Sequence, residues 1–216
     1  MHQLFAFECG PVATYTYLLC DTAAGAAVVI DVPSGSAQTL LDTAAKQHCT
    51  ITDVVLTHTH WDHTADAPAL LEQTNARLWV HPADVHRLTD PMAHTVWPLP
   101  FTIAPMTPDV LLEHGAVIEP AGLSLRVLHT PGHTEGGVCL VDEAHGRVFV
   151  GDTLFAGSVG RVDLPGGDED QLVDSIRTHL FALSDDLVAW PGHGPSTTIG
   201  HERRTNPFVG EGATQW

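Results

Sequence analysis

The chain has 216 residues, of which 44% are hydrophobic and 16% charged, so it holds enough apolar material for a globular core. Its formal net charge is −17, from nine Lys and Arg residues against 26 Asp and Glu residues. Because so acidic a field repels polyanions, sequence-independent binding to nucleic acid or to an anionic membrane is excluded.

Compartment signals are few. Residues 1–8 carry neither a basic segment nor a long apolar core, so they do not resemble a signal peptide. No window approaches the roughly 18 apolar residues of a membrane span. The four cysteines form no CxxC pair, which suits a reduced compartment. We therefore expect a cytoplasmic protein with no membrane partner, and the sequence indicates no oligomeric state.

Apolar periodicity predicts strands alternating with helices along the chain. The first half is expected to contain strands at 15–20 and 26–30 joined by a turn at 21–25, a helix at 36–48, a strand at 54–56, a helix at 66–74, a strand at 78–80 and a helix at 82–88. The second half is expected to contain strands at 117–118, 123–128, 137–141, 147–150 and 187–190, and an amphipathic helix at 171–183. The last part of the chain is polar with Gly and Pro, and we assign no element there.

Segment 90–108 has a different character. It carries prolines at positions 91, 98, 100, 105 and 108, with Trp97 and Phe101 between them. Proline removes backbone donors and breaks periodicity, so a long ordered loop is expected. Two interpretations stay open: a surface excursion packed on its own aromatic side chains, or a wall of the substrate pocket.

Segment 57–63, Thr-His-Thr-His-Trp-Asp-His, is the densest group of potential metal ligands. Imidazole and carboxylate are the usual ligands of zinc, iron and manganese. Alternate residues of an extended segment face the same side, so His58 and His60 can bind one ion. Asp62 and His63 follow where the chain is expected to turn, so they can face a second ion or a bound water.

Three later strands are also followed by candidate ligands. His133 lies in Thr-Pro-Gly-His-Thr, Asp152 in Gly-Asp-Thr and His193 in Pro-Gly-His-Gly. Loops at strand ends, held by a rigid scaffold, are where functional sites are built. One such occurrence means little, but four in the same register predict one shared metal site.

The motifs HxHxDH, TPGHT, GDT and PGHG, in this order, resemble the metallo-β-lactamase fold superfamily over nearly the whole chain. Segments 151–155 and 160–161 resemble glyoxalase II, the hydroxyacylglutathione hydrolases, and segment 200–208 is similar to the short, single-domain bacterial glyoxalase II-like branch. The resemblance implies an α/β fold, an αββα four-layer sandwich of two mixed β-sheets with outer helices. It also implies a single domain over residues 1–216, without the C-terminal helical domain that binds glutathione in longer enzymes.

The resemblance assigns roles to the candidate residues. Carried over by motif, the ligands of the first metal would be His58, His60 and His133, those of the second Asp62, His63 and His193, and the ligand bridging both Asp152. Asp31 corresponds to an aspartate that supports a ligand from behind. Two divalent ions are implied, with zinc as the expected metal and iron or manganese as alternatives.

The implied function is hydrolysis of a (hydroxy)acyl thioester, such as S-lactoylglutathione, by attack of a metal-bound hydroxide. Two divalent ions lower the pKa of a shared water and stabilise the oxyanion that forms after attack. Asp62 is implied as the catalytic residue that accepts the proton or orients the hydroxide. This small-molecule thioester is the expected partner.

Other functions stay open on the same fold. A persulfide dioxygenase would use one iron held by His58, His133 and Asp152, and a lactonase would open cyclic esters. Most zinc β-lactamases carry Cys or Ser where this chain has Asp152, which disfavours that activity. The non-enzymatic alternative is a metal-dependent binding module.

Arg161 is the candidate substrate-binding residue. It stands where longer glyoxalase II enzymes have Lys, and Asp163 stands where they have Tyr. Arg161 could bind a substrate carboxylate, or it could form an ion pair with Asp163 or Asp168. The thiol carried by the substrate therefore stays open.

Overall fold

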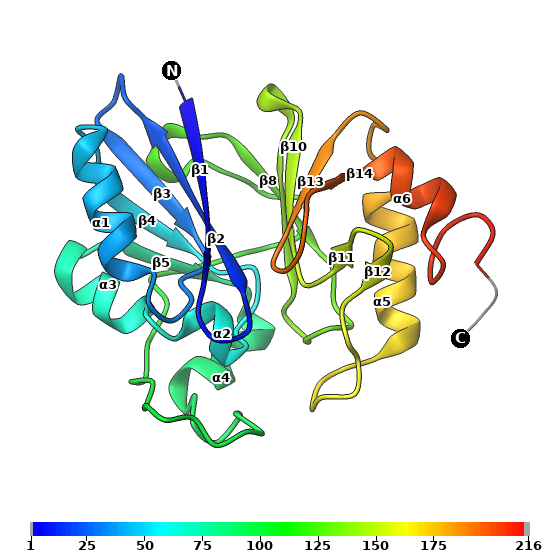
Figure 1. Cartoon of the computed structure of the whole chain (residues 1–216), viewed down its shortest axis with the longest axis horizontal. Helices are drawn as coiled ribbons and strands as arrows, with labels where there is room; N and C mark the ends of the chain where they lie inside the picture. Colours follow the sequence, from blue (N-terminus) through cyan, green and yellow to red (C-terminus); the bar gives the residue numbers. More distant parts are fainter. Residues whose placement is uncertain (1, 214–216) are drawn as a thin grey trace.

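Two mixed β-sheets pack face to face and carry helices on their outer sides (Figure 1). The computed structural model describes residues 2–213. The first sheet has strand order β1-β2-β3-β4-β5-β6, antiparallel from β1 to β3 and parallel from β3 to β6. Its strands are β1 His2–Cys9, β2 Thr14–Asp21, β3 Ala26–Ile30, β4 Thr50–Val55, β5 Arg77–Val80 and β6 Val110–Leu111.

The second sheet has strand order β14-β13-β10-β9-β8-β7, and within it β10 and β13 run parallel. Its strands are β7 Val117–Ile118, β8 Leu125–His129, β9 Val138–Asp142, β10 Arg147–Gly151, β13 Val188–Pro191 and β14 Thr197–Thr198. A separate two-stranded ribbon pairs β11 Leu154–Phe155 with β12 Ser158–Val159.

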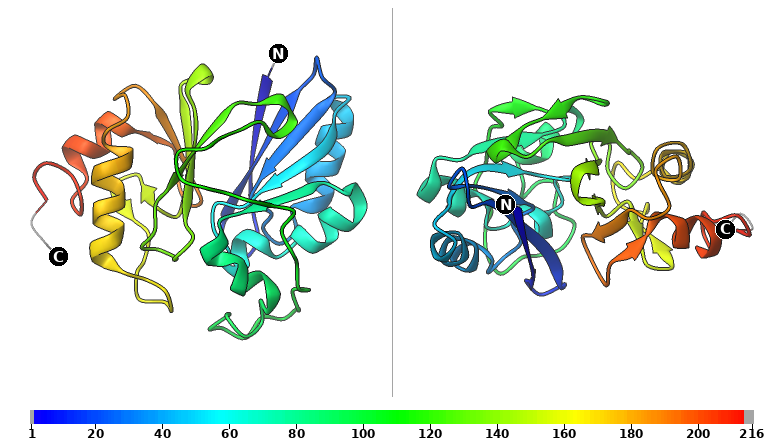
Figure 2. Two further views of the ribbon diagram at one scale, coloured as in Figure 1. Left: turned by 180° about the vertical axis from the view of Figure 1, so that it is seen from behind. Right: turned by 90° about the horizontal axis from the view of Figure 1, so that it is seen from above.

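Helices cover both outer faces of the sandwich (Figure 2). The α-helices are α1 Ala37–Lys46, α2 Trp61–Thr64, α3 Ala67–Thr74, α4 Val85–Thr89, α5 Glu169–Ser175 and α6 Ile199–Thr205. Short 3-10 turns are η1 Pro82–Asp84, η2 Pro120–Gly122 and η3 Glu143–His145, and η4 Ile176–Leu180 continues α5 as a π-helical turn. None of the described helices is both long and apolar enough to cross a membrane.

Three buried clusters separate the four layers. Leu40 and Leu70 join α1 and α3 to the first sheet. Phe149 lies between the sheets, where it packs with residues from both. Leu172 and Ile199 join α5 and α6 to the second sheet. Each fully buried side chain of this size stabilises the fold by about 1.5–3 kcal/mol, so these three clusters contribute strongly to holding the layers together.

The predicted αββα sandwich of two mixed sheets is confirmed. The predicted helix at 171–183 is partly wrong. It begins at Glu169 with Asp168 as its N-cap and ends in the π-helical turn at Leu180. The amide of Phe181 donates to the carbonyl of Ile176, five residues earlier, at 2.9 Å.

Several elements were not predicted: β1, α6, the short helix α2 and the two-residue strands β6, β11, β12 and β14. β1 is an edge strand whose side chains are mostly half-exposed, so its sequence lacks a clear buried stripe. α6 buries Glu202, which interrupts the apolar pattern. The carboxylate of Glu202 accepts hydrogen bonds from Thr197 Oγ1 at 2.6 Å and from the amide of Gly157 at 2.9 Å. These bonds offset the cost of burying the Glu202 carboxylate, because a buried charge without hydrogen-bond partners is strongly destabilising.

Candidate metal centre

The loops that carry the candidate ligands meet at one end of the two sheets, after β4, β8, β10 and β13. Backbone hydrogen bonds tie these loops across the sandwich. The amide of Val138 donates to the carbonyl of Thr57 at 2.8 Å, and the amide of Tyr15 donates to the carbonyl of Gly192 at 2.7 Å. The ligand-bearing loops are therefore part of the rigid scaffold.

The first group comprises His58, His60 and His133, each offering a ring nitrogen within 4.8 Å of the others. His60 Nδ1 lies 2.9 Å from His133 Nε2. His133 Nδ1 lies 2.7 Å from the carbonyl oxygen of Arg161, so that nitrogen carries the proton and donates it. Nε2 of His133 is then left to face the centre.

The second group comprises Asp62, His63 and His193, again with ligand atoms within 4.8 Å. Asp62 Oδ2 lies 3.2 Å from His193 Nε2 and 3.6 Å from His63 Nε2. The hydroxyl of Thr14 donates to the same oxygen at 2.9 Å. This bond from β2 holds the Asp62 carboxylate in place at the start of the short helix α2.

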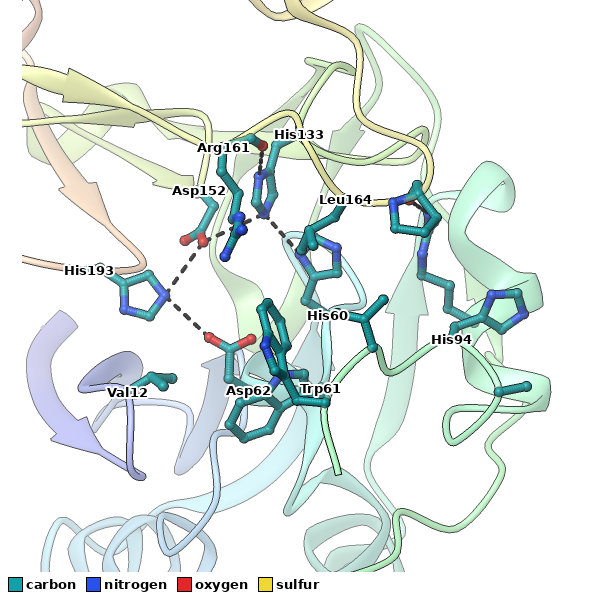
Figure 3. Close-up of a pocket in the computed structure, with 15 residues that line it drawn as sticks. Val12, His60, Trp61, Asp62, His94, His133, Asp152, Arg161, Leu164 and His193 are labelled. Carbon is teal, nitrogen blue, oxygen red and sulfur yellow. Dashed lines mark hydrogen bonds and ion pairs between the residues drawn. The ribbon is translucent and has the colours of Figure 1, made fainter. Parts of the chain in front are cut away.

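Asp152 lies between the two groups (Figure 3). Its Oδ2 is 3.5 Å from His133 Nε2 and 3.4 Å from His193 Nε2. Its Oδ1 is 3.3 Å from His63 Nε2. One carboxylate thus has one group on each side.

The donor atoms are placed to bind metal ions rather than to form hydrogen bonds with one another. Among the described residues, His58 Nε2, His63 Nε2 and Asp152 Oδ1 are buried without a hydrogen-bond partner. Leaving such a group unsatisfied costs about 1–3 kcal/mol, and more when it is charged. Nitrogen and carboxylate oxygen in groups of three are the donors that zinc, iron and manganese take. The arrangement therefore fits two divalent ions.

The pKa values of the histidines differ between the two groups of candidate ligands. Burial lowers the pKa of His60 to about 3, and it also lowers the pKa values of His58 and His133. Burial acts in the same direction on His63, but Asp152, Asp62 and Asp31 outweigh it and raise the pKa well above 6.5. The imidazoles of the first group therefore stay neutral, whereas the carboxylates around the second group stabilise a positive charge on His63.

Asp31 supports the second group from behind, at the end of β3. Its Oδ2 lies 2.8 Å from His63 Nδ1, and its Oδ1 accepts from the amide of Thr57 at 2.8 Å. The backbone of Asp31 is in the left-handed region, with φ of +59°, which is uncommon for a residue other than glycine. Asp31 thereby directs Nε2 of His63 toward Asp152.

Asp84 was not predicted as a site residue, yet it joins two of the ligand loops. This buried carboxylate accepts from the amide of Thr59 at 3.0 Å and from Thr134 Oγ1 at 3.0 Å. Thr59 stands between two candidate ligands and Thr134 follows a third. Asp84 comes after β5, as the ligands come after other strands, but its partners are too distant in sequence for any local pattern to reveal them.

Gly192 is required by the closeness of the groups around it. A Cβ atom at this position would collide with Asp152 Oδ1 and would lie 2.6 Å from His63 Cε1. Only glycine lets the backbone pass so close to these two side chains.

A pocket of about 340 Å³ opens above the cluster. Its floor includes His60, Asp62 and Asp152. Segment 90–108 contributes to its rim through Val96 and Trp97, as the pocket-wall interpretation predicts. The described residues of this segment contain no helix or strand.

Arg161 lines the pocket and forms an ion pair with Asp163. Its Nε and Nη2 atoms donate to the two carboxylate oxygens of Asp163, each at 2.7 Å. The guanidinium also lies over the ring of Trp97, 5.2 Å from the ring centroid. Of the two ion pairs considered from the sequence, the pair with Asp163 is the one present.

Comparison with known proteins shows which family the chain is similar to. The model of the metallo-beta-lactamase superfamily matches residues 9–193. Hydroxyacylglutathione hydrolase GloC from Haemophilus influenzae is 34% identical over 185 residues, which cover 85% of this chain and 87% of that protein.

Solved structures give the same picture. BLEG-1 B3 metallo-beta-lactamase has a TM-score of 0.87 at 32% identity, over 96% of this chain and 99% of that chain. TTHA1623 in a di-iron-bound form has a TM-score of 0.84 at 35% identity, over 95% and 100% of the two chains. ETHE1 from Myxococcus xanthus has a TM-score of 0.79 at 31% identity, over 96% and 84%.

Proposed function

The chain belongs to the metallo-beta-lactamase superfamily, and from this premise we propose that it hydrolyses acyl thioesters at a two-metal centre. The observation that carries the proposal is the position of Asp152 between two groups of three side chains. His58, His60 and His133 would hold one ion, Asp62, His63 and His193 the other, and Asp152 both. Zinc is the proposed metal.

When bound, two divalent ions would lower the pKa of a shared water and polarise the carbonyl oxygen of the substrate. The water oxygen adds to the carbonyl carbon and the bond from carbon to sulfur breaks. One proton of the water ends on the sulfur and the other is released, so the products are a carboxylate, a thiol and one proton. The pocket above Asp62 and Asp152 leaves room for the thioester beside the cluster.

Asp62 is proposed to orient the attacking water and to accept its proton. Burial raises the pKa of Asp62, but His63 and His193 outweigh burial and hold the pKa below its usual value. The carboxylate is therefore ionised at neutral pH. The hydrogen bond from Thr14 fixes one of its oxygens and leaves the other to meet the water.

The similarity to GloC supports a thioester as substrate. The similarity to ETHE1 favours a second candidate, a persulfide dioxygenase with a single iron at His58, His133 and Asp152, whereas the di-iron form of TTHA1623 supports a centre for two metal ions. The two candidates differ in metal content and in their need for oxygen.

A panel of metal-defined enzyme forms tests the proposal. Zinc, iron and manganese forms are each assayed against S-lactoylglutathione, simple acyl thioesters, glutathione persulfide, homoserine lactones and a β-lactam. Thioester hydrolysis that requires two metal equivalents is expected. Oxygen uptake on glutathione persulfide by a one-iron form, without thioester turnover, would replace the proposal with the dioxygenase. The Asp62→Asn variant is assayed in the same panel, and its thioester hydrolysis should fall at least about a hundredfold.

A further inference from the structure

The rim of the pocket is apolar and exposed. Val12, Val96 and Trp97 all line it, although 46%, 51% and 43% of their respective surfaces are exposed. Val12 lies in the turn between β1 and β2, and the other two lie in segment 90–108. Several large apolar side chains are seldom exposed to solvent side by side unless a ligand or partner covers them.

A third segment completes this rim. Leu164 and Pro165, after the ribbon of β11 and β12, line the same pocket, as does Trp61 beside the candidate ligands (Figure 3). Phe101 packs against Trp61, with ring centroids 6.3 Å apart. Segments far apart in sequence therefore build one apolar rim around the metal groups.

Both arginines that line the pocket are already paired within the described part of the chain. Arg161 donates twice to Asp163 and stacks on Trp97. Arg87 is 4% exposed, and its guanidinium contacts the carboxylates of Asp84 and Glu135. Neither arginine presents an unpaired charge to a substrate carboxylate.

The overall charge acts in the same direction. A protein with a formal net charge of −17 disfavours the approach of an anionic peptide such as glutathione. Besides the two metal ions proposed at the floor of the pocket, recognition of such a thiol would need cationic side chains to offset this field, and both arginines at the pocket are neutralised by their own neighbours.

We infer that the substrate is an acyl thioester whose larger portion is apolar and uncharged, bound against Val96 and Trp97; this inference rests on the hydrolysis proposed above. The stack of Arg161 on Trp97 keeps the indole at the rim, where its free face can cover an aliphatic or aromatic group.

A matched substrate series tests the inference at about pH 8, where ordinary imidazoles are uncharged. Lactoyl thioesters of glutathione and of benzyl thiol share one acyl group, and a phenylpropionyl thioester of ethanethiol places the apolar group on the acyl side. At least one apolar substrate should exceed S-lactoylglutathione about tenfold in kcat/KM, mainly through KM. If S-lactoylglutathione exceeds both, the inference is overturned while the hydrolysis stands.

Two variants connect the preference to named residues. Trp97→Ala should remove most of the tenfold advantage, whereas Val117→Ala, at a valine that is 59% exposed and lies outside the pocket, should not. Asp163→Asn releases Arg161 from its ion pair, so it should raise kcat/KM for S-lactoylglutathione several-fold relative to the apolar substrates. An unchanged ratio in both Trp97→Ala and Asp163→Asn contradicts the inference.

Binding gives a readout that is independent of turnover. Calorimetry compares benzyl methyl sulfide with S-benzylglutathione, neither of which can be hydrolysed as a thioester. Tighter binding of the neutral sulfide, lost in Trp97→Ala, supports the apolar subsite. Tighter binding of S-benzylglutathione opposes it. If no thioester turns over in any metal form, the proposed hydrolysis fails, and this binding comparison still decides the character of the pocket.

Discussion

The buried carboxylate of Asp84 accepts a hydrogen bond from the backbone amide of Thr59 at 3.0 Å. The same carboxylate accepts from Thr134 Oγ1 at 3.0 Å and from the amide of Gly136 at 2.7 Å. One side chain thus fixes the spacing between the loop of His58 and His60 and the loop of His133.

Replacing Asp84 by Asn should weaken both the fold and the metal centre. The amide cannot accept from all these donors, and Arg87 loses one of its two carboxylate partners. We expect the free energy of unfolding to fall by about 3 kcal/mol and the metal affinity to fall about 10–100-fold. Urea unfolding and titration against a chromophoric chelator measure the two effects.

Asp53→Asn is the matched control. Asp53 is equally buried and accepts from Arg77 Nε at 3.0 Å and from the amide of Ala121 at 2.9 Å, away from the candidate ligands. It should lose comparable stability and keep its metal affinity. If the two variants lose metal affinity equally, the specific role of Asp84 in the ligand loops is wrong.

Gly192→Ala should abolish binding at the second group of ligands. The added methyl would displace Asp152 and His63, between which the glycine backbone passes. Gly194→Ala serves as the control, because among the described residues, its two chain neighbours apart, no heavy atom lies within 4 Å of the place that its new methyl group would occupy. Its φ of +75° alone costs about 1–2 kcal/mol. Metal analysis of both variants should show a loss in Gly192→Ala alone.

Metal stoichiometry separates the two groups. His193→Ala should reduce binding from two divalent ions to one, because it removes a donor of the second group and leaves the first intact. His201→Ala, at an exposed histidine outside the cluster, should retain both ions. Retention of two ions in His193→Ala would refute the proposed division of ligands.

The candidate ligands could be predicted because each follows a strand end, and strand ends are visible as short apolar runs. The meeting of the loops that carry His58, His133 and His193 follows from that register once the sheets pack. Asp84 could not be predicted in this way, since its role depends on bonds to Thr59 and Thr134, which only the tertiary structure brings together.

The layers of the fold could be predicted from alternating apolar residues, whereas β1 and α6 could not. β1 lies at a sheet edge, where burial is incomplete and the pattern is weak. α6 turns a charged residue, Glu202, inward, and its hydrogen-bond partners Thr197 and Gly157 come from separate segments. In both elements the tertiary environment decides what the local sequence leaves ambiguous.

Acid should destabilise the protein partly through His81. Burial and the neighbouring His129 lower the pKa of His81 to about 4, although Asp84 opposes them. The unfolded chain, with an imidazole pKa of about 6.5, binds more protons than the folded chain between these values. The contribution of His81 is therefore complete above about pH 6.5 and is lost as pH falls toward 4.

His81→Asn removes this titration and keeps a side chain that can accept from the amide of Ala83, as Nδ1 of His81 does at 3.3 Å. Unfolding measured from pH 7.5 down to about pH 4 should show a shallower decline for the variant. Parallel curves for the two proteins would mean that His81 does not contribute to the acid sensitivity.

The candidate ligands are spread from His58 to His193, in loops that follow strands of both sheets. While the chain is being synthesised, the ribosome releases His58, His60, Asp62 and His63 long before His193. A nascent chain with β4 and α2 alone has nothing to close the cluster, and any ion that it picks up is held by an incomplete set of donors. The two ions proposed above would therefore be acquired only after β13 has joined the second sheet.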